Sequence, residues 1–178
     1  VLLEKSPKIA VYSPEDKQPW DDAVTLVLAY AEITYDIVFD HEVLTGELSK
    51  YDWLHLHHED FTGQYGKFYK SYKNTAWYRD LKINFEKTAS NHGFNSVHKL
   101  KKSVANKIKK YITNGGFMFA MCSATDSFDI ALSALNVDIV ESVYDGSPID
   151  KNYKQKLNFS NSIAFENYSL YTNPNIYE

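Results

Sequence analysis

The stretch GGFMFAMCSATD at residues 115–126 decides how the rest of the chain is interpreted. Its two glycines can end a helix, because glycine takes the left-handed conformation without penalty. The apolar run that follows predicts a buried strand over 117–121, and a helix is expected over 127–135. Cys122, the only cysteine of the chain, stands where the strand turns into that helix. A thiol at such a turn is exposed above the sheet edge, where the helix N-terminus favours the thiolate.

Short apolar strands and helical patterns alternate on the N-terminal side of this stretch and continue after it. Strands are expected over 8–12, 36–39, 52–57 and 136–140, and further helices over 20–33 and 97–113. Such apolar strands, separated by helices, are typical of a parallel sheet that is buried on both faces. The predicted fold is therefore α/β, a doubly wound and mostly parallel flavodoxin-like sheet with helices on both faces. Beyond residue 144 the alternating pattern, as in Leu157-Asn158-Phe159-Ser160, favours extended or hairpin structure.

Length and composition indicate one domain over 1–178, in which the sheet looks unfinished at its C-terminal end. A net charge of −4 argues against nucleic acid as a partner, since no basic excess is present to neutralise phosphates. No apolar run has the 18 or more residues that a membrane span needs. The chain opens at Val1 without a methionine, so its compartment is left open: cytoplasmic, or periplasmic or secreted if a signal has been removed.

Two regions invite a binding interpretation. Residues 59–96 are rich in aromatic side chains and too long for a structureless loop, so they should be partly helical or functional. Their interleaved aromatic and basic residues over 65–79 can stack sugars or bases, although a surface that packs on itself is favoured. The helix over 97–113 carries six lysines, which we expect on a solvated outer face: Lys99, Lys101, Lys102, Lys107, Lys109 and Lys110.

The surroundings of Cys122 are typical of a nucleophile elbow, a sharp strand-to-helix turn that exposes a reactive side chain. The positions two residues away must be small so that strand and helix can pack closely, and here they are Ala120 and Ala124. The competing interpretation is a buried cysteine that serves as a small hydrophobic residue.

The order of the elements and this elbow together resemble the class I glutamine amidotransferase-like domain over about residues 8–140. That family has Gly-x-Cys-x-Gly at the elbow, and here alanine replaces both glycines. The stretch YDWLHLHHEDFTGQ, ending at Gln64, is similar to a bacterial branch often labelled asparagine synthetase B. The resemblance implies a cysteine hydrolase that acts on a small amide-like substrate without a cofactor, as a homo-oligomer or with a partner synthase.

The same resemblance implies further site residues. Backbone N–H groups of the loop at 58–63 would face the substrate oxygen, so Glu59, Asp60 and Gly63, together with Ser123, are the substrate-binding candidates. The family's catalytic histidine lies downstream of the nucleophile, but all six histidines of this chain precede Cys122. The base is therefore His57 or His58, at the same sheet end as the elbow, or a histidine beyond Glu178. If there is no base, the chain is a binding module whose recognition surface is the loop at 58–80.

A third hypothesis is a metal-dependent hydrolase. Strand alternation places His55 and His57 on one face, and Asp60 follows closely. Imidazole and carboxylate ligands suit zinc or another first-row ion. Two histidines within a buried strand are more often hydrogen-bonded core residues, so a metal at this position ranks below the other two hypotheses.

Overall fold

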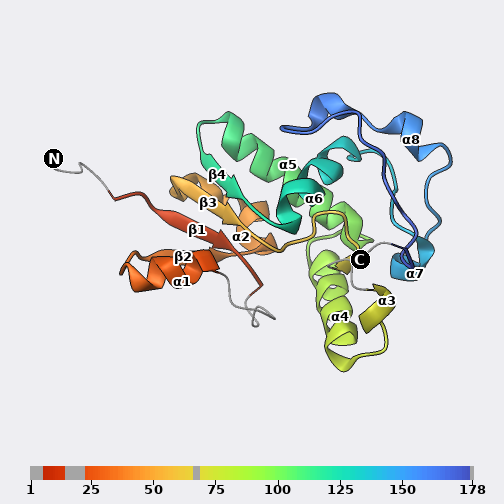
Figure 1. Cartoon of the computed structure of the whole chain (residues 1–178), viewed down its shortest axis with the longest axis horizontal. Helices are drawn as coiled ribbons and strands as arrows, with labels where there is room; N and C mark the ends of the chain where they lie inside the picture. The colour runs from red at the N-terminus through yellow and green to blue at the C-terminus, as the bar shows by residue number, and fades with distance from the viewer. Residues whose placement is uncertain (1–5, 15–22, 66–68, 177–178) are drawn as a thin grey trace.

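The computed structural model describes residues 6–14, 23–65 and 69–176, and its centre is a four-stranded parallel sheet (Figure 1). The strands are β1 (Ile9–Tyr12), β2 (Tyr35–Val38), β3 (Trp53–Leu56) and β4 (Phe117–Ala120). They lie in the order β2-β1-β3-β4, and every neighbouring pair is parallel. The order matches the first four strands of the flavodoxin-like arrangement, so the predicted α/β fold class is confirmed.

Helices connect the strands and extend beyond them. The longer ones are α1 (Ala23–Tyr30), α2 (Asp40–Thr45), α4 (Ala76–Asn91), α5 (Val97–Thr113) and α6 (Ser123–Ser133). The shorter ones are η1 (Glu47–Lys50), α3 (Tyr69–Tyr72), α7 (Ser142–Asp145), α8 (Tyr153–Lys156) and η3 (Phe159–Asn161). The prediction of a helix over 97–113 is confirmed, whereas α6 begins four residues before the predicted start at residue 127. Residues 20–22 of the predicted helix over 20–33 lie outside the described residues.

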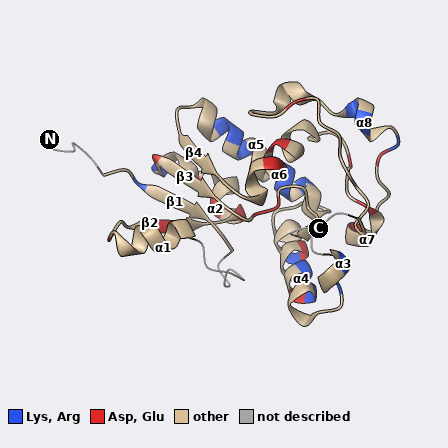
Figure 2. Cartoon of the chain, in the orientation of Figure 1, with Lys and Arg blue, Asp and Glu red and all other residues tan. Residues whose placement is uncertain are grey.

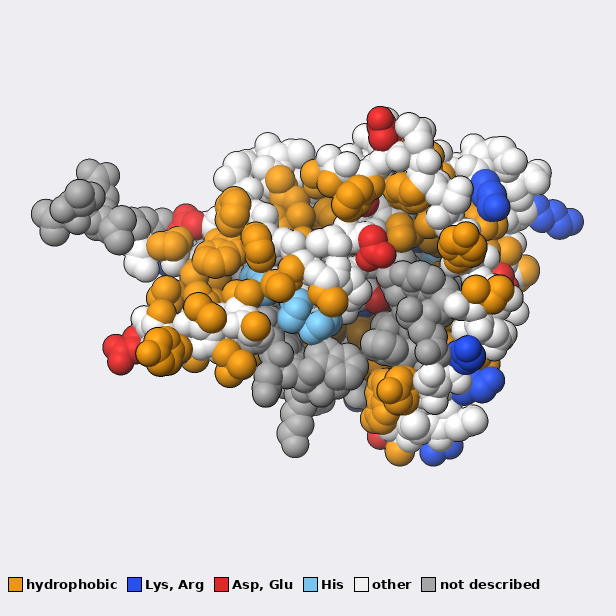
Figure 3. Space-filling model, in the orientation of Figure 1, with side chains coloured by type: hydrophobic (Ala, Val, Ile, Leu, Met, Phe, Trp, Pro, Cys, Tyr) orange, Lys and Arg blue, Asp and Glu red, His pale blue; other side chains and the backbone are white. Residues whose placement is uncertain are grey.

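The two faces of the sheet are covered unequally. Because the step from β1 to β2 runs opposite to the others, right-handed crossovers place α1 on one face and α2 and α5 on the other, where α6 packs against α5. The second face holds the main core, to which Tyr12, Leu54 and Leu56 contribute. On the α1 face Phe117 and Phe119 remain 57% and 44% exposed. Figure 3 shows hydrophobic side chains gathered over this part of the molecule.

The region after α6 differs from the prediction. Residues 136–140 do not form the predicted strand, because Asp138 accepts a hydrogen bond from the Val140 N–H at 3.0 Å and turns the chain. Val137 and Ile139 are buried nevertheless. Their apolar side chains therefore pack in the core without belonging to a strand. The hairpin expected around Leu157–Ser160 does not form in the described residues: Leu157 and Asn158 are extended but unpaired with a strand, and η3 begins at Phe159.

The final segment is attached to α6 through one buried carboxylate. Asp129 accepts hydrogen bonds from the N–H groups of Ile163, Ala164 and Phe165 at 2.8, 2.7 and 2.7 Å. Hydrogen bonds to a charged group are the stronger kind, and three of them converge here on one side chain. Asp129 therefore folds the tail back against α6, where α6 and the blue tail run close together (Figure 1).

Figure 2 shows basic positions along α5 in blue. Two of these lysines, Lys101 and Lys102, are buried, which corrects the expectation of a solvated lysine face. Lys101 lies 2.9 Å from both carboxylate oxygens of Asp40 and 3.0 Å from the Tyr12 hydroxyl. Its ammonium group also sits 4.3 Å from the ring centre of Phe39. Lys102 donates to the carbonyl of Val137. Charged groups tolerate burial when they are paired, and the sequence pattern carries no sign of these distant partners.

The aromatic region over 59–96 is partly helical, as expected, because it contains α3 and α4. Tyr65 and Tyr78 are buried, and Tyr65 also meets the ring of Tyr144 at 6.1 Å between centroids. Burial raises the pKa of these tyrosines, so their hydroxyls stay protonated. These rings pack on one another, whereas residues 66–68 lie outside the described part of the chain.

Across residues 6–14, 23–65 and 69–176, no helix combines the length and the apolar character that crossing a membrane requires.

Candidate active site

Cys122 occupies a turn with an uncommon backbone conformation. It is exposed, it is the N-cap residue of α6, and its φ and ψ are 53° and −136°. A positive φ is costly for a residue with a side chain and is found mainly where the surroundings enforce it. The flanking Ala124 is fully buried, so strand and helix approach each other closely at this position. This is the strained strand–turn–helix geometry that a nucleophile elbow has.

Neighbouring strands bring the loop after β3 to this turn. The Ala124 N–H donates to the carbonyl of His57 at 3.1 Å, and the Ser123 hydroxyl donates to the carbonyl of His58 at 2.7 Å. The Ser127 hydroxyl adds a bond to the Glu59 carbonyl at 3.0 Å. The N-terminal part of α6 therefore fixes the backbone of the loop after β3, residues 57–64, which we call the histidine loop.

The side chains of His57, His58 and Cys122 meet at this position. One ring nitrogen of each histidine and the thiol sulfur lie within 4.8 Å of one another. The two imidazoles are 3.6 Å apart between centroids, with their planes inclined by 32°. His57 is 9% exposed, whereas the thiol lies at the surface. The structure thus brings together the three residues that the sequence analysis put forward as catalytic.

Two of the predicted substrate-binding residues make hydrogen bonds within their own loop. A carboxylate oxygen of Glu59 accepts the N–H of His57 at 2.9 Å. Asp60 accepts the N–H and the hydroxyl of Thr62 at 2.9 and 2.6 Å, and the N–H of Gln64 at 2.7 Å. Both carboxylates therefore stabilise the turn that presents the histidines.

The remaining two candidates have clear positions as well. Gly63 has a φ of 90°, and a Cβ at this residue would lie 2.6 Å from the Cα of His98. Only glycine fits there, so Gly63 docks the loop onto the start of α5. Ser123 is the first residue of α6, so its backbone N–H lies outside the helical hydrogen-bond ladder. In nucleophile elbows that N–H contributes to the oxyanion hole.

The structure does not assemble the metal site suggested by the sequence. Among the described residues, the groups of three whose donor atoms converge are His57/His58/Cys122 and His98/Asp138/Asp145. His55 is fully buried and stacks on Phe119, with 5.9 Å between the ring centres. Because Asp60 also bonds within its own loop, His55, His57 and Asp60 do not form a joint ligand set.

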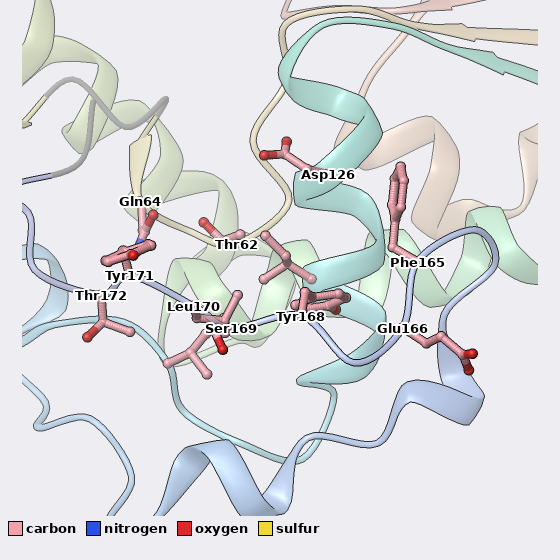
Figure 4. A pocket seen from close by; sticks show the side chains of 12 residues that line it. Thr62, Gln64, Asp126, Phe165, Glu166, Tyr168, Ser169, Leu170, Tyr171 and Thr172 are labelled. Carbon is pink, nitrogen blue, oxygen red and sulfur yellow. The ribbon is translucent and has the colours of Figure 1, made fainter.

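A cavity of about 350 Å³ lies beside α6 and the histidine loop (Figure 4). Asp126, one helical turn after Cys122, borders it, as do Thr62 and Gln64 from the loop after β3. Ile130 of α6 and Ile139 add apolar side chains, and the tail adds both apolar and polar ones: Phe165, Glu166, Tyr168, Ser169, Leu170, Tyr171 and Thr172. The sequence analysis missed the tail residues, because long-range hydrogen bonds to Asp129 and Ser133 bring them to α6.

Comparison of the chain with protein-family models, with curated proteins and with solved structures gave no match. The resemblance to class I amidotransferases therefore rests on the elbow and on the order of the elements.

Proposed function

We propose that this protein is a cysteine-dependent hydrolase of small amides, with Cys122 as its nucleophile. The observation that carries the proposal is the exposed thiol on a positive-φ turn, with two imidazoles within 4.8 Å of it. A thiol needs a nearby base to react quickly at neutral pH, and imidazole is the usual one. The strand order and the two flanking alanines support the same assignment.

The reaction would proceed in two steps. An imidazole takes the thiol proton while the sulfur attacks the carbonyl carbon of the amide, and the developing oxyanion faces the N–H of Ser123. The tetrahedral intermediate then collapses to a thioester, and the imidazolium gives its proton to the departing amine. Water, deprotonated by the same imidazole, hydrolyses the thioester and returns the free thiol.

His58 is the better candidate for the base. It is more exposed than His57, so it can reach both the sulfur and a bound substrate. His57 packs directly against the imidazole of His58 and is largely buried. It therefore suits a residue that positions the His58 ring. The two roles predict different results from single replacements, as set out in the Discussion.

The cavity beside α6 indicates what the substrate would look like. The tail contributes apolar side chains such as Phe165 and Leu170 together with the carboxylate of Glu166, and Asp126 and Gln64 add polar groups. Ligand cavities commonly combine an apolar lining with a few polar groups that fix orientation. A small amide that carries both an apolar portion and polar groups therefore suits this cavity.

Acylation by activated esters tests this proposal. Protein incubated with p-nitrophenyl acetate and p-nitrophenyl phenylacetate should release one rapid equivalent of nitrophenol and gain one acyl group by intact mass. Cys122→Ser should show neither effect. Acyl groups on lysines in place of Cys122, or equal labelling of Cys122→Ser, would refute the nucleophile. Absence of any adduct would favour the binding module.

The same three donors also suit a zinc centre, and this is the second candidate function. Two imidazoles and a thiolate within 4.8 Å leave one zinc position open, as catalytic zinc sites do. Acylation measured with a chelator and with added zinc separates the two candidates. The thiol mechanism predicts full acylation in chelator and inhibition by zinc, whereas a zinc enzyme would lose ester hydrolysis in chelator.

A further inference from the structure

A second group of converging side chains lies away from the elbow, between α5 and the loops that follow α6. His98 is at the start of α5, Asp138 follows α6, and Asp145 ends α7. The Nε2 atom of His98 is 3.5 Å from Oδ2 of Asp138 and 3.8 Å from Oδ2 of Asp145. The group borders a cavity of about 420 Å³ and shares no residue with the proposed active site.

One oxygen of this group has no hydrogen-bond donor among the described residues. The side chain of Asp145 is 9% exposed, and its Oδ2 atom is buried without a hydrogen-bond partner in that part of the chain. Its Oδ1 atom accepts the N–H and the hydroxyl of Ser147 at 2.9 and 2.8 Å. A buried carboxylate oxygen without a donor is costly, so the position calls for a positive partner.

The single hydroxyl hydrogen of Ser147 cannot serve both acids. The Ser147 Oγ atom lies 2.8 Å from Oδ1 of Asp145 and 3.1 Å from Oδ2 of Asp138, so the hydroxyl hydrogen favours Asp145. Oδ1 of Asp138 accepts the Val140 N–H, and its Oδ2 atom faces the ring of His98. One oxygen of each acid and a ring nitrogen of His98 therefore lie within 4.8 Å of one another. The two negatively charged carboxylates, of Asp138 and Asp145, repel each other at so short a distance unless a cation lies between them.

The groups around the imidazole do not supply that cation. Lys102 stands on the opposite side of the ring, 3.2 Å from Nδ1, and so leaves Nε2 directed at the two acids. Lys99 and Asp150 also border the cavity, and Asp150 is paired with Lys156 at 3.4 Å.

We propose that His98, Asp138 and Asp145 bind a divalent first-row cation, with zinc as the best fit. Ligand atoms around a tetrahedral zinc ion with bonds of about 2.0–2.1 Å lie about 3.4 Å apart. The two distances from Nε2, 3.5 and 3.8 Å, are close to that value. The fourth position faces the cavity and is available to water. One imidazole and two carboxylates are ligands that zinc accepts readily.

The ion would have a structural effect that reaches the histidine loop. It would connect the first turn of α5 to the last residue of α7 and to the segment between α6 and α7. The backbone of His98 is also the surface on which Gly63 docks. Zinc binding therefore stabilises the start of α5, against which the loop that carries His57 and His58 packs. The proposal itself does not depend on the hydrolase assignment.

Zinc and cobalt titrations of the Cys122→Ser chain test the proposal, because this variant removes the thiol at the elbow. Chelator-treated protein should bind one equivalent of zinc, and its unfolding midpoint should rise by several degrees, since a ligand of the native state stabilises it by mass action. Cobalt should give the intense visible absorption of a tetrahedral site, without a thiolate charge-transfer band. Less than about a tenth of an equivalent of bound zinc would overturn the proposal.

Single replacements in the same background locate the ion. Asp145→Asn and His98→Gln should each weaken zinc binding at least about 100-fold, because each removes a direct ligand. Asn95→Ala alters a neutral residue that borders the same cavity and should change the affinity less than about threefold, since Asn95 accepts a hydrogen bond from Lys99 and is not a ligand. Unaltered affinity in Asp145→Asn would refute the site. If both ligand variants fail to fold, the cobalt spectrum of Cys122→Ser decides, and an octahedral spectrum refutes the site.

Discussion

The two groups of converging donors differ in access and in how the backbone holds them. Cys122 is exposed on a positive-φ turn, and its two histidines belong to a loop fixed by hydrogen bonds to α6. His98, Asp145 and Asp138 lie largely beneath the surface, and a carboxylate oxygen there has no donor among the described residues. An exposed, strained thiol suits a reaction with an incoming molecule, whereas an enclosed acid pair suits the retention of an ion. The comparison teaches that similar residue types serve different chemistry when their burial differs.

The largest expected effect concerns the histidines beside the thiol. His58→Asn should lower the rate of Cys122 acylation at pH 7 about 100-fold or more, because a positioned base contributes that much. His57→Asn should cost less, since this ring orients its neighbour. His41→Asn is the matched control, because His41 pairs with His92 away from the elbow, and its rate should stay at the wild-type value. Stopped-flow nitrophenol release measures all three, and equal rates in His58→Asn and wild type would contradict the assignment.

A second prediction concerns the anchor that connects α6 to the tail. Asp129→Ala removes the acceptor of three backbone N–H groups and should destabilise the protein by about 3 kcal/mol. Asp129→Asn keeps one acceptor oxygen and should lose roughly half as much. Urea unfolding followed by circular dichroism gives both values. A loss below about 1 kcal/mol in Asp129→Ala would mean that the tail contributes little to stability.

A third prediction uses the ammonium group beside His98. Burial lowers the pKa of Lys102 to about 8, below the ordinary value of a lysine. Between pH 8 and about 10.4 the unfolded chain therefore binds more protons than the folded one, and stability rises with pH in that window. In chelator, the free energy of unfolding should increase by about 1–2 kcal/mol from pH 7.5 to 9.5.

Lys102→Met is the control for this pH effect, because methionine keeps an unbranched apolar side chain and cannot titrate. The increase between pH 7.5 and 9.5 should disappear in this variant. If the variant and the wild type show the same rise, another group is responsible, and the account of the buried cluster would need revision.

The smallest expected effect separates stability from reactivity at the elbow. Cys122→Gly should raise the free energy of unfolding by about 0.5–1 kcal/mol, because glycine adopts a positive φ without strain, although it also gives the unfolded chain more freedom. Cys122→Ser keeps the side chain and should change stability by less than about 0.5 kcal/mol. Thermal unfolding compares them, and a destabilised Cys122→Gly would show that the turn is not strained.

Residue patterns predicted the strands well and the C-terminal part poorly. The apolar runs ending at Tyr12 and Leu56 form strands as expected, because each is short and bounded by polar residues. The run at 136–140 looks the same in sequence, but the carboxylate of Asp138 turns the chain, so its apolar residues fill the core without pairing. A buried apolar segment and a paired strand look the same in the sequence, and only their tertiary contacts distinguish them.

The candidate sites show the same division. The elbow could be predicted, because a cysteine between small residues at a strand-to-helix turn is a local pattern. Contact with His57 and His58 followed from parallel strands that end at one edge. His98, Asp138 and Asp145 lie far apart in the chain at no ligand-like spacing, so only the fold brings them together. The loop bonds of Asp60 were likewise invisible in the sequence.

The most direct test of the central claim is the rate of Cys122 alkylation by iodoacetamide at pH 7 in chelator, followed by intact mass. An activated thiol should be modified once and faster than the same thiol in the urea-unfolded chain, and His58→Asn should slow the reaction of the folded protein. A folded protein that reacts no faster than the unfolded chain, at a rate unaltered in His58→Asn, would contradict the claim that the imidazoles activate Cys122.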